Sequence, residues 1–145
     1  MKIIIEDLKE GENEEIIIRS NNIDESILQM IYGIKNHNMK IAGMHNGQIN
    51  MIDPKDIYYF ESVDNKTFIY CKEKVFESKS KLYELENEFS NTSFFRASKS
   101  TILNLSKIKK LQPMFNGRFE AILSNNEKVV ISRKFVPVLK EKLGL

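Results

Sequence analysis

Residues 94–104 read FFRASKSTILN, and both ends of this stretch have the composition of short β-strands. The aromatic and β-branched residues predict strands at 94–97 and 101–105. Between them stand Ser98, Lys99 and Ser100. The stretch therefore predicts a pair of strands whose junction carries one basic and two hydroxyl side chains.

The regions on either side of this stretch have the same strand-like pattern. Asn46-Gly47 and Asn116-Gly117 each stand between two such runs, and Asn-Gly there is a strong signal for a β-hairpin. Alternation along 108–113 places Ile108 and Lys110 on one face and Lys109 and Leu111 on the other. Further strands are predicted at 41–44, 48–52, 57–60, 67–71, 75–78, 108–114, 119–123 and 128–131.

Two short helices are predicted within this β-rich region. The first has Leu82, Leu85 and Phe89 on one face and follows a cap at Ser78 or Ser80. The second follows a loose turn at 132–136, because Pro137 is tolerated only in the first turn of a helix.

The first 39 residues predict a separate small unit. Ile-rich runs at 2–6 and 14–19 predict two strands, and a helix with Asn22 as its cap follows. We expect a ββα unit at 1–39 and a β domain at 40–145. The fold class is mostly β with short helices (α+β).

The charge is unevenly distributed along the chain of 145 residues. The net charge is +2, but residues 1–92 carry 11 basic and 17 acidic side chains, whereas residues 93–145 carry 11 and 3. These parts have net charges of −6 and +8. Such asymmetry suggests a polyanionic partner for the basic part.

Several classes of protein are not expected from the composition. No apolar run is long enough to span a membrane, and the N-terminus has no signal-peptide pattern, so a cytoplasmic protein is expected. Neither His37 nor His45 has a thiol or carboxylate at metal-ligand spacing, and Cys71 is expected to be a buried, inert thiol. Because no nucleotide-binding or hydrolase motif is present, we expect no enzyme, cofactor or metal.

Three junctions between the predicted elements carry basic or amide side chains: Asn65-Lys66, the 98–100 turn, and Arg133-Lys134. Long basic side chains on loops can reach base edges, and hydroxyls can donate to phosphates. Solvated loop charges explain the same pattern equally well. The aromatic residues of the strands could stack on single-stranded bases, although core packing is the simpler explanation.

Four segments in register carry a family resemblance. Residues 94–104 are similar to the pattern F-x-R-x-H-[RK/N]-S-x-[IV]-[VL]-N, and residues 56–62, 115–119 and 130–135 agree in order and spacing. Together, over about residues 40–145, the chain resembles the LytTR DNA-binding domain of bacterial transcription regulators. Because residues 1–39 are too few for a receiver domain, the resemblance is to the stand-alone form.

The resemblance implies an elongated β domain whose loops enter successive major grooves of double-stranded DNA. It implies a sequence-specific transcription regulator that binds paired promoter repeats as a homodimer. Lys99 and Arg133 correspond to base-reading positions, and Thr67, preceded by Lys66, falls in a third contact loop. Arg118, Lys107 and Lys134 correspond to contacts with the DNA backbone. The base preference does not transfer, because Ser98 stands where the family often has His.

Alternatives remain open at this point. The 1–39 unit has more apolar surface than it can bury alone, which suggests dimerisation or docking of a regulatory protein. A protein-interaction adaptor that keeps the fold without binding DNA is the main rival function, although the +8 charge of residues 93–145 argues against it. A binder of single-stranded RNA would instead expose aromatic side chains on a sheet face.

Overall fold

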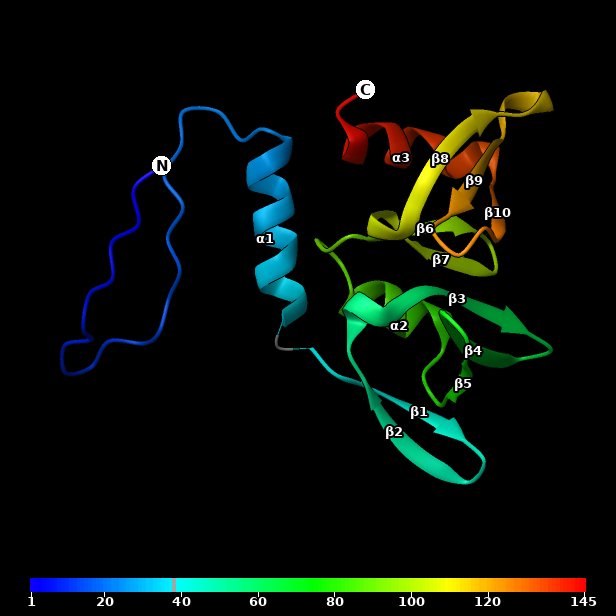
Figure 1. Cartoon of the computed structure of the whole chain (residues 1–145), viewed down its shortest axis with the longest axis horizontal. Helices are drawn as coiled ribbons and strands as arrows, with labels where there is room; N and C mark the ends of the chain where they lie inside the picture. The colour runs from blue at the N-terminus through cyan, green and yellow to red at the C-terminus, as the bar shows by residue number, and fades with distance from the viewer. Residues whose placement is uncertain (38) are drawn as a thin grey trace.

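The computed structural model describes residues 1–37 and 39–145, and in this part of the chain strands dominate (Figure 1). The helices are α1 (Glu25–His37), α2 (Leu82–Glu88) and α3 (Val136–Leu143). The strands are β1 (Ile41–His45), β2 (Gln48–Ile52), β3 (Ile57–Val63), β4 (Lys66–Cys71), β5 (Val75–Ser78), β6 (Phe94–Ser98), β7 (Thr101–Asn104), β8 (Ile108–Pro113), β9 (Phe119–Leu123) and β10 (Lys128–Ile131). Short 3₁₀ turns stand at η1 (Pro54–Asp56), η2 (Leu105–Lys107), η3 (Phe115–Gly117) and η4 (Arg133–Phe135). The predicted fold class, mostly β with short helices, is confirmed.

The strands form two antiparallel sheets. The larger has the order β2-β1-β5-β4-β3-β7-β6, and the smaller has the order β10-β9-β8. β3 is an interior strand of this sheet, because it pairs with β4 through Phe60 opposite Ile69 and with β7 through Phe60 opposite Ile102. The strand pair β6–β7 predicted from residues 94–104 therefore lies at one edge of the large sheet.

Each face of the large sheet packs on a separate apolar core. Phe60, Phe94 and Ile102 point to the face covered by α2. Tyr58, Phe95 and Leu103 point to the other face, where the small sheet and α3 pack. Since successive strand residues alternate between faces, adjacent apolar residues such as Phe94 and Phe95 supply both cores.

The hairpin turns form where the sequence places them. Asn46 and Gly47 have φ values of 49° and 74°, which is the left-handed geometry that a two-residue hairpin turn needs. Asn116 and Gly117 have φ values of 65° and 74°. Asn and Gly reach this region at little cost, so these turns fix the register of the strands that they join.

The predicted alternation of side chains between the two faces of β8 is wrong. The register of β8 against β9 shifts between Ile108 and Lys110, so one extra residue is inserted there. As a result Ile108 and Leu111 both pack against the second core, while Lys109 and Lys110 are exposed. A β-bulge of this kind resets which face each later side chain occupies.

The expected helix caps also need correction. α1 begins after Asp24, not Asn22: the Asp24 carboxylate accepts hydrogen bonds from the Ile27 amide at 3.0 Å and the Ser26 hydroxyl at 2.9 Å. These bonds lower the pKa of Asp24, because they stabilise its charged form. At α2 the cap is not a serine; the Glu84 carboxylate accepts from the Lys81 amide at 2.9 Å.

The C-terminal helix forms as expected. The 3₁₀ turn η4 precedes α3, and Pro137 lies in the first turn of the helix, where its missing amide costs nothing. Gly144 ends the helix with a φ of 72°.

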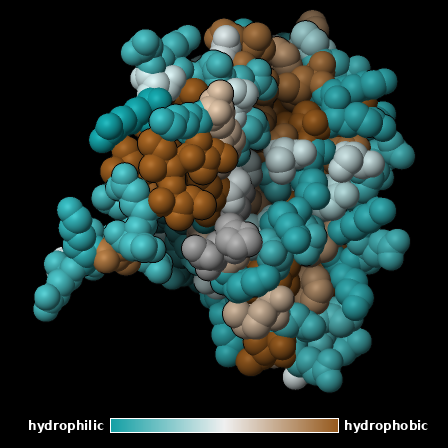
Figure 2. Space-filling model, turned by 60° about the vertical axis from the view of Figure 1, so that its left-hand side comes forward, coloured by the Kyte–Doolittle hydropathy of each residue, from teal (hydrophilic) through white to brown (hydrophobic). Residues whose placement is uncertain are grey.

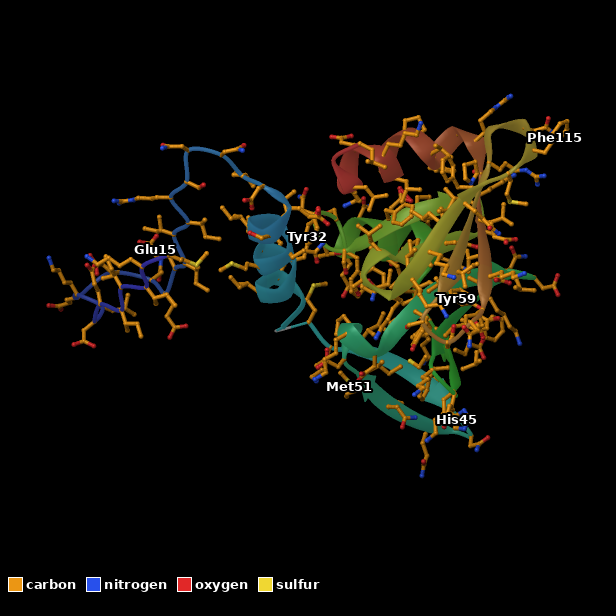
Figure 3. All side chains as sticks on the ribbon, turned by 45° about the horizontal axis from the view of Figure 1, so that its top comes forward. Glu15, Tyr32, His45, Met51, Tyr59 and Phe115 are labelled. Carbon is orange, nitrogen blue, oxygen red and sulfur yellow. The ribbon has the colours of Figure 1, made fainter. Side chains whose placement is uncertain are left out.

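The two strands predicted at 2–6 and 14–19 are wrong. These residues are exposed and belong to no sheet, although a turn forms between them in which the Glu12 amide donates to the Lys9 carbonyl at 3.1 Å. An isolated two-stranded hairpin is marginal in water, because it has no core to cover. α1 does reach the β domain, since Lys142 Nζ lies 5.3 Å from the centre of the Tyr32 ring, and Figure 3 shows Tyr32 on the side of α1 toward that domain.

The boundary between residues 1–39 and 40–145 stays a prediction. None of the helices in the described residues is long and apolar enough to cross a membrane.

Candidate nucleic-acid interface

Backbone hydrogen bonds join the three loops that carry the predicted site residues. The Ser62 amide donates to the Ser100 carbonyl at 2.8 Å, and Ser62 lies opposite Thr67 beside the β3–β4 turn. On the other side, the Ser132 amide donates to the Ala97 carbonyl at 2.9 Å. The β3–β4 turn, the β6–β7 turn and the β10–α3 junction therefore share one edge of the molecule, on the right-hand side of Figure 1.

A groove lies between two of these loops. It is lined by Arg96, Ser98, Lys99, Ser100, Ser132, Lys134 and Phe135. Lys99, Ser100 and Lys134 are exposed, and Ser98 is half-buried. The structure thus brings together the residues predicted at the 98–100 turn and at the β10–α3 junction, which are more than thirty residues apart in sequence.

A fourth loop, η3 at the tip of the β8–β9 hairpin, joins this edge through Arg133. A Cβ atom on Gly117 would lie 3.1 Å from Cδ and 3.2 Å from Cγ of Arg133, so the aliphatic part of the arginine lies directly on the glycine. Arg118 follows and is exposed. Phe115, which Figure 3 labels at the tip, is 83% exposed.

We name these four segments the loop cluster: residues 64–66, 98–100, 115–118 and 132–134. In it Asn65, Lys66, Lys99, Arg118, Arg133 and Lys134 are all exposed. None of these six residues forms an ion pair with an acidic side chain in the described structure. The cluster is therefore an edge on which five basic side chains outnumber one exposed carboxylate, that of Asp64, with hydroxyl groups between the charges.

Arg96 holds the β6–β7 turn, and its role was missed in the sequence. Its Nη2 donates to the Lys99 carbonyl at 2.6 Å and its Nε to the Ser98 carbonyl at 2.8 Å. Its Nη1 forms an ion pair with Glu86 of α2 at 2.6 Å. A planar guanidinium can make all three bonds at once, so Arg96 fixes the turn that presents Lys99. Its position in the family-like pattern was the signal that could have indicated this.

Two predicted site residues lie away from the surface of the cluster. The Thr67 side chain is only 3% exposed and lies on the same face of β4 as the core residue Ile69, so its hydroxyl does not reach the surface. Lys107 belongs to η2, at the end of β8 opposite η3, and its Nζ lies 4.9 Å from the centre of the Tyr58 ring.

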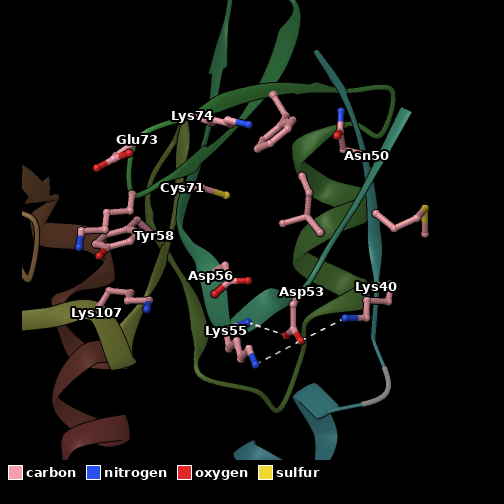
Figure 4. A pocket seen from close by; sticks show the side chains of 14 residues that line it. Lys40, Asn50, Asp53, Lys55, Asp56, Tyr58, Cys71, Glu73, Lys74 and Lys107 are labelled. Carbon is pink, nitrogen blue, oxygen red and sulfur yellow. Dashed lines mark hydrogen bonds and ion pairs between the residues drawn. The ribbon is translucent and has the colours of Figure 1, made fainter. Parts of the chain in front are cut away.

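Lys107 instead lines a hollow near the start of β3 (Figure 4), which contains five lysines. Two of them form ion pairs with Asp53, whose Oδ2 lies 3.2 Å from Nζ of Lys40 and 3.9 Å from Nζ of Lys55. Cys71 also lines the hollow and is half-buried, not buried as expected; its partial burial raises the pKa of its thiol to about 11. The thiol is therefore protonated near neutral pH, as expected for an inert cysteine.

The aromatic residues of the strands are mostly in the cores. Tyr58, Phe60, Phe94 and Phe95 are all buried, so core packing is confirmed for them. His45 is half-buried, with its ring against Phe76. The side chain of His37 lies outside the described residues.

Comparisons with known proteins bear on the family and the fold of the chain. A family model described as the LytTr DNA-binding domain matches residues 47–144. The chain belongs to the LytTR family. It has the fold of a solved LytTr DNA-binding domain from a methyl-accepting/DNA response regulator of Bacillus cereus, with a TM-score of 0.69 at 24% identity, over 73% of this chain and 97% of that one.

Relatives by sequence include regulators of other bacteria. The chain is 34% identical over 113 residues to the sensory transduction protein LytT of Enterococcus faecalis, covering 78% of this chain but 46% of that protein. It is 28% identical over 128 residues to an uncharacterized HTH-type transcriptional regulator of Staphylococcus aureus, covering 88% and 85%. The chain thus spans about half the length of the LytT proteins that it matches. The family is one of DNA-binding domains and not a class of enzymes.

Proposed function

We propose that the protein is a sequence-specific transcription regulator that binds double-stranded DNA through the loop cluster. The observation that carries this proposal is the meeting of four loops at one edge, where the exposed lysines and arginines form no ion pair with an acidic side chain among the described residues. Loops that project from a rigid sheet can enter the major groove, where each base pair presents a distinct pattern of donors and acceptors.

The roles divide by position in the cluster. Lys99 and Arg133 read base edges, since long basic side chains bind the acceptors of guanine. Ser98 and Ser100 donate to phosphates beside Lys99, and Asn65, Lys66, Arg118 and Lys134 contact the DNA backbone. Thr67 contributes only by fixing the strand from which Lys66 projects, because its own side chain is buried.

Affinity should depend strongly on salt. Residues 93–145 have a net charge of +8, and each phosphate that a lysine or arginine neutralises releases bound counterions. A homodimer on paired promoter repeats suits the proposal, because two copies related by a two-fold axis read two half-sites.

The test uses the full chain and a duplex selected from a random duplex library. We expect Lys99→Ala and Arg133→Ala each to weaken binding to the selected duplex by about 1–3 kcal/mol while leaving weak binding to a scrambled duplex intact. Lys72→Ala is the matched control: it removes the same charge from an exposed lysine at the distant hollow. Fluorescence anisotropy at two salt concentrations measures all three.

Three results would contradict the proposal. Equal losses on selected and scrambled duplexes would show that Lys99 and Arg133 contact phosphate only. Failure to bind any duplex at low salt would favour the protein-interaction adaptor, and preferential binding to single-stranded RNA would favour an RNA-binding function.

A further inference from the structure

Two segments near the N-terminus have the same unusual design. Residues 2–6 read KIIIE and residues 15–19 read EIIIR, so each has three isoleucines between two opposite charges. Ile3, Ile4 and Ile5 are 82%, 66% and 92% exposed, and Ile16, Ile17 and Ile18 are 68%, 61% and 40% exposed. Figure 2 shows hydrophobic side chains gathered on the surface that this side of the molecule presents. β-branched runs of this kind favour strands, yet neither segment is paired here.

The two segments face each other across a groove. Its walls include Lys2, Ile4 and Glu6 from the first segment and Glu15, Ile17 and Arg19 from the second. Both segments extend away from the β domain, and Figure 3 shows Glu15 well clear of it. Their backbone groups are thus open to pairing with an incoming strand.

Charge opposes closure of the groove within one chain. The turn in which Glu12 bonds to Lys9 fixes the register, so a closed hairpin would place Lys2 opposite Arg19 and Glu6 opposite Glu15. Like charges directly opposite one another destabilise a strand pair.

The same segment of a second copy fits where the chain's own segment does not. If residues 2–6 of two copies run antiparallel with Ile4 opposite Ile4, each Lys2 meets the other copy's Glu6. A strand in that position also runs parallel to residues 15–19, which places its Lys2 beside Glu15 and its Glu6 beside Arg19. The four charged residues that flank the isoleucines, Lys2, Glu6, Glu15 and Arg19, then each have an opposite charge beside them.

We propose that residues 2–6 of a second copy insert into the groove between residues 2–6 and 15–19, and that two copies do this reciprocally to form a homodimer. The arrangement is a four-stranded sheet with a two-fold axis at Ile4, which is the closed symmetry that homodimers favour. The inference rests on the proposed function, because it supplies the homodimer that binds paired promoter repeats. The dimer itself requires no DNA and is tested without it.

The first test reverses charge. Lys2→Glu places glutamates opposite one another in the dimer, whereas in a closed hairpin it would relieve repulsion by facing Arg19. We expect sedimentation of the full chain to shift from dimer toward monomer for Lys2→Glu and for Glu6→Lys. Mixing these two variants should restore dimers in part, because it again places opposite charges at positions 2 and 6 of the two copies. Lys9→Glu, which makes the same change on the turn outside the segments, should leave the dimer intact.

The second test is covalent. Residues on the two-fold axis of an antiparallel pair have Cα atoms within disulfide reach. Ile4→Cys should therefore form a disulfide-linked dimer on mild oxidation, whereas Ile17→Cys, on an outer strand, should not link to its own copy.

Both tests can contradict the proposed dimer interface. A monomeric wild type, a dimer unaffected by Lys2→Glu, or equal crosslinking of both cysteine variants would overturn the proposed interface. Binding of one half-site duplex would be untouched by any of these outcomes, so failure of this interface and failure of the DNA-binding proposal are distinguishable.

Discussion

The conformation of the turn that presents Lys99 depends on the contacts of one half-buried residue, Arg96. Its guanidinium binds the carbonyls of Ser98 and Lys99, and its side chain is only 20% exposed. Since Lys99 is held through its backbone, its amino group stays free to meet a ligand. The residue that fixes the geometry of the site is thus distinct from the residues that would touch DNA.

Replacing Arg96 should separate these roles. Arg96→Lys keeps the charge but loses the forked bonds to the two carbonyls, so we expect affinity for the selected duplex to fall about tenfold, since bonds to a charged group contribute about 1.5–3 kcal/mol. Glu86→Gln is the control, because it removes only the ion pair with a half-exposed carboxylate. Equal effects of both variants on anisotropy titrations would show that the carbonyl bonds do not position the turn.

Cys71 gives a second prediction at this scale. Burial moves its thiol pKa from 9.0 to about 11, so at pH 8 the folded protein holds about a hundredfold less thiolate than a free cysteine, and thiolate is the reactive form. Alkylation by iodoacetamide should be slow at pH 8 and accelerate toward pH 11. The thiol should react normally in denaturant; labelling of the folded protein at the free-cysteine rate would refute the assignment.

Among the elements, the junction of β3, β7 and η2 is held by a single buried amide. Asn104 Nδ2 donates to the Ile57 carbonyl at 2.8 Å, while its Oδ1 accepts from the Ser93 hydroxyl at 2.9 Å and from the Ser106 amide at 3.1 Å. The side chain is 1% exposed. Its bonds join β3 to β7, one of the two strands that the β6–β7 turn connects.

Loss of this amide should loosen the junction. Asn104→Ala leaves buried donors and acceptors without partners, and we expect it to lower the free energy of unfolding by about 2–3 kcal/mol. Ser106→Ala, at an exposed position that also bonds to Asn104, should cost below about 1 kcal/mol. Urea denaturation measures both, and similar small losses would argue against a structural role for Asn104.

The elements also show what a sequence can and cannot predict. Turn residues with positive φ and strands with apolar residues on both faces, such as Phe94-Phe95, are local signals, and the strands of the β domain follow them. The bulge in β8 is not visible in the alternation, because it depends on the partner strand. The Ile-rich segments failed as intrachain strands for a related reason: strand propensity does not say which strand will be the partner.

At the scale of the whole molecule, the basic loops and the lysine-lined hollow lie apart. Three loops of the cluster were predicted from their basic or amide residues, and Arg118 of the fourth from the family resemblance. Thr67, however, is buried, and Lys107 lies at the hollow. The strands explain both positions. Thr67 lies on the buried face of β4, and β8 separates η2, which carries Lys107, from η3 at its other end. The fold thus selects which of the positive charges can act together.

One measurement tests the central claim most directly: backbone amide NMR of the full chain titrated with the selected duplex. We predict that the largest shifts fall on residues 64–66, 98–100, 115–118 and 132–134, and that amides beside Lys72 and Lys107 at the hollow change little. Shifts concentrated at the hollow, or spread evenly over the basic surface, would contradict recognition of DNA by the loop cluster.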